Sequence, residues 1–129
     1  MNSLLKLMNK AEEFCCLGKI ESDEITKAEQ SLGLSFAEEY KEYTQAFGAA
    51  AFDGHELTGI CKSKRLFVVP VTERARITYP NFPTNAYVIE ELLIDHVLVI
   101  QDSSGTVLSY GPTDSGKVIA QSLQEYLFP

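Results

Sequence analysis

The stretch ITKAEQSLGLSFAEEYKEYTQAFGAAAFDGHELTG, residues 25–59, predicts two short helices followed by a turn and a strand. Ser22 can cap the first helix, and Gly33 stands where a left-handed residue ends a helix. Ser35 is predicted to begin the second helix, with Glu38 at the spacing of a capping box. Aromatic residues then recur at steps of three and four, which places them on one helix face.

The second helix is expected to end at Gly48, and Asp53 and Gly54 form a turn before a strand at residues 57–60. The pattern elsewhere predicts helices at residues 3–16, 70–76 and 117–127, and strands at residues 66–69, 86–93, 96–102 and 106–110. The sequence therefore predicts an α+β fold: an antiparallel sheet of about five strands with helices packed mainly on one side. Its 129 residues suit a single domain, 1–129.

The net charge of −7 is unevenly distributed along the chain. Acidic residues crowd the two helices and the last third, and a basic island lies between them, formed by Lys62, Lys64, Arg65, Arg74 and Arg76. An acidic surface repels the phosphate backbone, so we expect no nucleic-acid partner. The same surface suits rapid docking of a basic protein, although it also serves solubility alone.

Residue patterns typical of catalysis or metal binding are missing from the sequence. The two histidines, His55 and His96, are far apart and share no ligand spacing with each other or with cysteine. Residues 111–117 resemble a phosphate loop, but Val118 replaces the hydroxyl residue that would reach Mg²⁺. We therefore predict no catalytic residue, no metal and no cofactor.

The sequence also indicates the cell compartment. Apolar runs are far shorter than the roughly 20 residues that a membrane span requires, and the N-terminus does not read as a secretion signal. Three cysteines, two of them adjacent at Cys15 and Cys16, make a poor disulfide framework. We expect a reduced, cytoplasmic protein with no membrane partner, in which Cys15 and Cys61 are small buried residues.

The spaced motif in this chain resembles that of the SUKH superfamily, small α+β domains of yeast cell-wall regulators and bacterial immunity proteins. The resemblance is carried by the following residues: Ile25, Ala28-Glu29, Leu32-Gly33-Leu34, Glu39-Tyr40-Lys41, Phe47-Gly48, Glu56-Leu57-Thr58-Gly59, Ile119-Ala120 and Ser122-Leu123-Gln124-Glu125-Tyr126-Leu127. Together these residues span most of the chain.

The resemblance implies a non-catalytic protein-binding module, namely a cytoplasmic immunity protein that binds and neutralises a cognate toxin domain, often a nuclease. The alternative is a regulatory scaffold domain of the same fold that binds a cellular protein. Loops carry recognition on a rigid scaffold, and no basic residue lies between Arg76 and Lys117 in the sequence. We therefore predict that a basic partner contacts five acidic residues: Asp53, Glu56, Glu90, Glu91 and Asp95.

Overall fold

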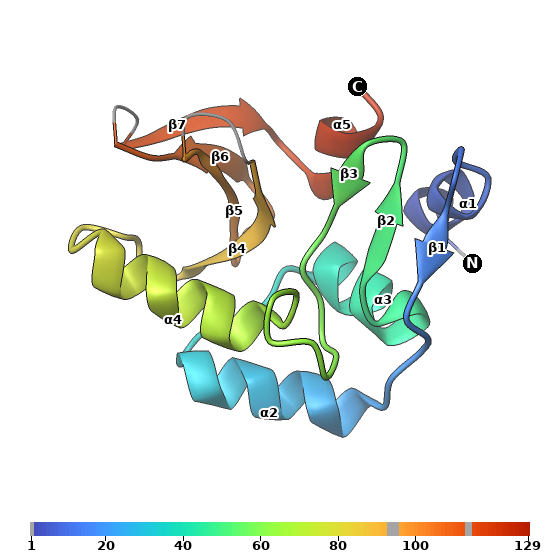
Figure 1. Ribbon diagram of the computed structural model, residues 1–129, viewed down its shortest axis with the longest axis horizontal. Helices are drawn as coiled ribbons and strands as arrows, with labels where there is room; N and C mark the ends of the chain where they lie inside the picture. The colour runs from blue at the N-terminus through green and yellow to red at the C-terminus, as the bar shows by residue number, and fades with distance from the viewer. Residues whose placement is uncertain (1, 93–95, 113–114) are drawn as a thin grey trace.

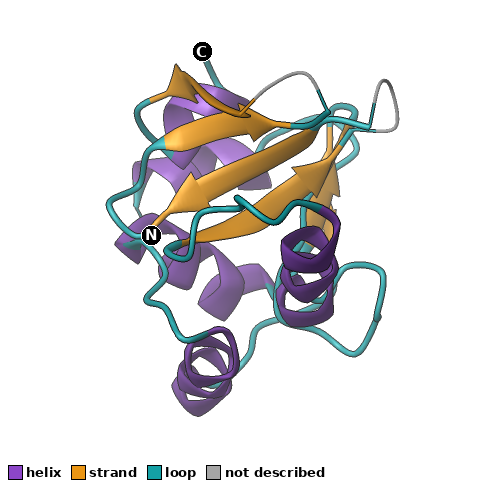
Figure 2. Ribbon diagram, turned by 90° about the vertical axis from the view of Figure 1, so that its left-hand side faces the viewer, coloured by secondary structure: helices purple, strands orange, loops and turns teal. Residues whose placement is uncertain are grey.

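The computed structural model describes residues 2–92, 96–112 and 115–129. In chain order these residues form α1 (Ser3–Asn9), β1 (Cys15–Cys16), α2 (Ser22–Leu32), α3 (Glu38–Phe47), β2 (Ala50–Phe52), β3 (His55–Glu56), α4 (Val68–Thr78), β4 (Ala86–Glu91), β5 (Leu98–Asp102), β6 (Val107–Tyr110), β7 (Ser115–Ala120) and α5 (Leu123–Leu127). Figure 1 shows the sheet of β4–β7 arching over α4, with α2 beneath α4. Figure 2 shows the strands in the upper part of the molecule and the helices behind and below them.

The strands form two antiparallel sheets, β1–β2–β3 and β4–β5–β6–β7. A bridge between Leu57 and Glu90 joins the chain after β3 to β4. The next residue, Thr58, donates its N–H to the carbonyl of Ile89 at 2.9 Å. The predicted α+β class with antiparallel strands is confirmed, and the strands are divided between a three-stranded and a four-stranded sheet.

Strand β4 is buried on both faces, which explains its almost unbroken apolar sequence. Tyr87 and Ile89 point into the larger core cluster, to which α1, α2, α3 and α5 all contribute. Ala86 and Val88 point the other way, into a cluster formed with Val71 and other residues of α4. Most helices therefore pack on one side of this sheet, and α4 covers the other.

The helix pair in residues 25–59 is present, but its second member begins later than expected. Gly33 ends α2 with a φ of 67°, as predicted. The prediction that Ser35 caps α3 is wrong, because the N-cap residue is Ala37 and makes no side-chain cap bond. The chain before it is extended, and the Phe36 N–H donates to a carboxylate oxygen of Glu29 at 2.8 Å.

Three other segments differ from expectation. Residues 66–69 were expected to be a strand, yet α4 begins at Val68, with Pro70 in its first turn, where a missing N–H costs nothing. Residues 117–127 were expected to be one helix, but they contain part of β7 followed by the five-residue α5. The first helix ends at Asn9, and Cys15 is exposed on β1 rather than buried. Cys61, also expected to be buried, is half-buried.

Candidate partner-binding groove

A groove of about 800 Å³ opens between α4, β4 and the chain that leads from β3 to α4. Its apolar lining includes buried Val71 and Ala75 of α4 and half-buried Leu98 at the start of β5. Exposed charged or titratable residues of the lining are Glu56, Arg65, Arg74, Glu91 and His96. The groove therefore combines an apolar floor with a rim that carries both signs of charge.

Arg65 and Glu56 form an ion pair at this rim. The Arg65 Nη2 donates to Glu56 Oε2 at 3.0 Å, and Nη1 donates to Oε1. The hydrogen bonds and positive charge of this guanidinium lower the pKa of Glu56. The charge of Glu91 also acts on Arg65 and helps to raise its pKa. The positive charge of Arg65 therefore interacts with two carboxylates, those of Glu56 and Glu91.

Glu90, one residue before Glu91, faces the opposite way and is almost completely buried, with a side chain that is 4% exposed. Its Oε2 accepts the N–H of Glu56 at 2.8 Å. Its Oε1 accepts the hydroxyl of Tyr126 at 2.6 Å and lies 3.0 Å from His55 Nδ1. One carboxylate thus joins β3, β4 and α5, and its hydrogen-bonding capacity is largely used within the protein.

The environment of Glu90 shifts the titration of two neighbours. The hydrogen bond to Glu90 raises the pKa of His55, an effect that partial burial of the ring opposes. Burial raises the pKa of Tyr126, and its hydrogen bond to the Glu90 carboxylate raises it further. His55 is half-buried between Glu90, Tyr126 and Phe52.

The structure brings together only some of the acidic residues predicted to contact a partner. Glu56 and Glu91 are exposed and line the same groove. Asp53 is exposed in the β2–β3 turn, directly before a residue of the groove lining, Gly54. Glu90 does not lie on an exposed face as expected, because a register shift between Val88 and Glu90 interrupts the alternation of β4 and leaves Glu90 facing Tyr126 and His55. Asp95 lies outside the described residues.

Two basic residues of the groove, Arg65 and Arg74, were not among the predicted site residues. The basic island was located only by its place in the sequence, between the acidic helices and the acidic last third. A bridge between Gly59 and Phe67 instead folds the intervening chain back, which lets Arg65 reach Glu56. A long-range pairing of this kind leaves no local signal in the sequence.

The described residues offer no cluster for a metal ion and no helix suited to a bilayer. Across residues 2–92, 96–112 and 115–129, no three side chains of His, Cys, Asp or Glu gather as a metal site requires. His96 was expected to open a strand, but it lies exposed in a turn before β5 with a φ of 55°. Among the same residues, no helix has the length and apolar character needed to cross a membrane.

Comparison with known proteins places the sequence in a family. A solved structure, "Crystal structure of protein from Pseudomonas syringae pv. tomato", resembles this chain with a TM-score of 0.70 and 13% identity, over 98% of this chain and 94% of that chain. At this identity the likeness concerns the fold alone. Comparison with curated proteins gives no significant match. Residues 1–128 match the SUKH_5 family, described as "SMI1-KNR4 cell-wall". The chain therefore belongs to this SMI1-KNR4 cell-wall family of the SUKH superfamily.

Proposed function

We propose that this protein is a non-catalytic, cytoplasmic immunity protein that binds a cognate toxin domain and blocks it. The observation that carries the proposal is the groove, in which exposed acidic residues border an apolar floor. An apolar anchor from the toxin would be desolvated against Val71, Ala75 and Leu98. Basic residues around that anchor would face Glu56 and Glu91, with Asp53 at the neighbouring turn.

The existing bonds of the acidic residues support binding rather than catalysis. Glu90 accepts hydrogen bonds from the Tyr126 hydroxyl and the Glu56 N–H, and Glu56 is paired with Arg65. Glu90 is buried, and Arg65 lowers the pKa of Glu56 and so makes Glu56 a weaker general base. Charges at the exposed rim would chiefly set the association rate and the choice of partner.

The test uses a secreted toxin domain encoded beside the gene for this protein. Co-expression of the two proteins should restore growth, and the purified pair should associate at a rate that falls with added salt. Asp53→Lys and Glu91→Lys should each slow association by about 3- to 10-fold at low salt. Glu73→Lys is the matched control, because Glu73 is exposed on α4 but does not line the groove.

The possible outcomes test the immunity role and the binding surface separately. Failure to bind the toxin or to protect growth would contradict the immunity role. Binding and protection that are unchanged by both Asp53→Lys, at the turn beside the groove, and Glu91→Lys, in its lining, would retain immunity but reject this face as its surface. A slowing by Glu73→Lys equal to that of Glu91→Lys would show a general effect of net charge.

The second candidate is a regulatory scaffold domain that binds a cellular protein. The family to which this chain belongs is described by a reference to the cell wall. That description favours the scaffold role if no toxin gene lies beside the gene for this protein. Such a domain would bind its partner through the same groove without protecting cells from a toxin. The growth assay therefore distinguishes the two roles, and the groove variants test the surface in both.

A further inference from the structure

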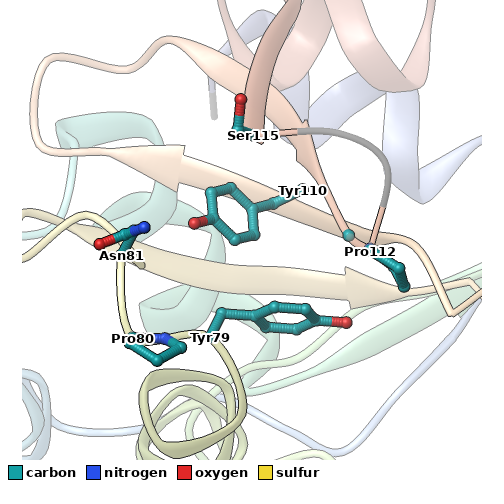
Figure 3. Close-up of a pocket in the computed structure, with 7 residues that line it drawn as sticks. Tyr79, Pro80, Asn81, Tyr110, Pro112 and Ser115 are labelled. Carbon is teal, nitrogen blue, oxygen red and sulfur yellow. The ribbon is translucent and has the colours of Figure 1, made fainter.

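The groove along α4 has two ends that differ in character. One face of the helix lines the groove, from Val71 to Thr78, and the lining continues to Tyr79 directly after the helix. There Tyr79 packs edge-to-face against Tyr110, with ring centroids 5.4 Å apart and planes that meet at 79° (Figure 3). At the other end, before α4 begins, the lining includes Arg65, whose side chain is 65% exposed. The groove thus has a packed aromatic end and an end formed by a long charged side chain.

Glu56 is the fixed member of the ion pair at the charged end. Its backbone N–H donates to the buried Glu90 carboxylate at 2.8 Å, and the next residue, Leu57, forms a bridge with Glu90 of β4. These contacts hold the backbone of Glu56 against the sheet. The Glu56 side chain is 51% exposed, so a partner can reach its carboxylate from solvent.

Arg65 is the movable member of the pair. The chain around it is held by two backbone hydrogen bonds of 2.8 Å, from Gly59 N–H to the carbonyl of Leu66 and from Val68 N–H to the carbonyl of Gly59. Arg65 itself lies in a turn, and among the described residues its guanidinium bonds only with Glu56. The side chain can therefore leave Glu56 by rotation about its own bonds, without a change in the backbone.

The contact between Arg65 and Glu56 occupies both oxygens of the carboxylate. Nη1 donates to Oε1 and Nη2 donates to Oε2, the two-bond geometry typical of arginine and carboxylate. An arginine of a partner cannot form the same two bonds while Arg65 holds them. An exposed ion pair adds little to the stability of a fold, so a partner that displaces Arg65 leaves the fold intact.

We propose that Arg65 is an internal competitor, which a basic side chain of the partner displaces from Glu56. This inference rests on the proposed function, because that function places basic residues of the partner at the groove. While Arg65 holds Glu56, a protein that merely carries positive charge gains little at this rim. A cognate partner offsets the displacement of Arg65 through additional contacts, such as an apolar anchor against Val71 and Ala75. Arg65 therefore improves specificity and lowers affinity.

The test is a titration of the full chain with a capped (Gly-Arg)₄ peptide, followed by two-dimensional amide NMR. Amide shifts should concentrate at residues 54–58 and 90–92 of the groove, and a capped (Gly-Gln)₄ peptide should produce none. Arg65→Gln should tighten binding of (Gly-Arg)₄ about 3- to 5-fold, the upper range for the strength of an exposed ion pair. In a Glu56→Gln background the same substitution should tighten binding by less than about 1.5-fold, because no carboxylate remains to be released.

Arg74→Gln is the matched control, because Arg74 lines the same groove but belongs to no ion pair among the described residues. It removes the same charge and should tighten binding by less than about twofold. The proposal is overturned if Arg65→Gln acts no more strongly than Arg74→Gln, or if it weakens binding, which would make Arg65 a direct contact for the partner.

The proposal is also overturned if (Gly-Arg)₄ shifts no groove amides in either the wild type or Arg65→Gln. Its failure is distinguishable from failure of the immunity role, because the peptide titration requires no toxin. A titration with the expected results, together with a toxin that fails to bind, would support the competitor and contradict the immunity role.

Discussion

Gly59 packs directly against the backbone of Gly48, where no other residue fits. A β-carbon on Gly59 would lie 1.9 Å from the Gly48 carbonyl oxygen, and that oxygen accepts the N–H of Ile60 at 2.9 Å. Gly48 itself has a φ of 71°, a backbone conformation that favours glycine. The two glycines therefore let the chain after β3 lie against the end of α3.

The first prediction concerns this contact. Gly59→Ala should destabilise the protein by more than about 3 kcal/mol, beyond usual overpacking, because the obstructing atoms are backbone. Gly33→Ala is the control: its β-carbon would meet nothing within 4 Å, so it should cost only the roughly 1–2 kcal/mol of a left-handed conformation. Urea unfolding measures both, and equal costs would show that the Gly48–Gly59 contact is not tight.

The second prediction concerns Glu39, whose carboxylate accepts the N–H groups of Leu123 and Gln124 and the side-chain amide of Gln101. Glu39→Gln puts a donor where an acceptor is needed and removes the charge. The free energy of unfolding should fall by about 1.5–3 kcal/mol, the range for hydrogen bonds to charged groups. Glu38→Gln, at a side chain 83% exposed, should change it by less than about 0.5 kcal/mol. Similar values for the two variants would contradict a capping role for Glu39.

The third prediction separates an apparent helix cap from a real one. The Ser122 hydroxyl accepts the Glu125 N–H at 3.0 Å at the start of α5, so Ser122→Ala should cost about 1 kcal/mol. Ser35 precedes the Ala37 N-cap of α3, so Ser35→Ala should change the free energy of unfolding by less than about 0.5 kcal/mol. Thermal or urea unfolding of the two variants measures both values. A larger loss for Ser35→Ala would restore the capping box that the sequence suggested.

The fourth prediction concerns pH. Because Glu90 raises the pKa of His55 in the folded protein, the stabilisation from protonated His55 is complete below its unfolded pKa of about 6.5. It should disappear as pH rises through the higher folded pKa. His55→Gln should therefore lose stability relative to wild type below pH 6.5, and the difference should shrink at alkaline pH. Urea titrations at several pH values measure the difference in free energy of unfolding between wild type and His55→Gln. If that difference grows with pH, protonated His55 does not stabilise the folded protein. NMR titration of the His55 ring measures the shift independently.

Much of the fold could be predicted because local patterns agreed with the final packing. Gly33 and Gly48 end their helices as expected, and β4, β5 and β6 lie where apolar runs indicated. The errors arose where propensity and context disagree. Val68 and Val69 favour a strand, but burial of one side of α4 overrides that preference. Val118 and Ile119 in β7 carried a strand signal that was missed.

The groove could be predicted only in part. Glu56 and Glu91 were recognisable as surface acids, and both are exposed at its rim. The burial of Glu90 follows a register shift between Val88 and Glu90 in β4, which reverses the face that simple alternation would give it. The charge balance of the groove depends on Arg65, whose approach to Glu56 follows from pairing between distant segments.

The bond between Glu39 and the start of α5 spans 84 residues of sequence. A ribosome makes a chain from its N-terminus, so Glu39 leaves the exit tunnel long before Leu123 is joined to the chain. Until then its carboxylate lacks the N–H donors of Leu123 and Gln124, and the core residues Leu123 and Leu127 are missing. The N-terminal helices can form during synthesis, but this core closes only once residues 123–127 have left the ribosome, so truncation before Leu123 would leave apolar surface open to chaperones and proteases.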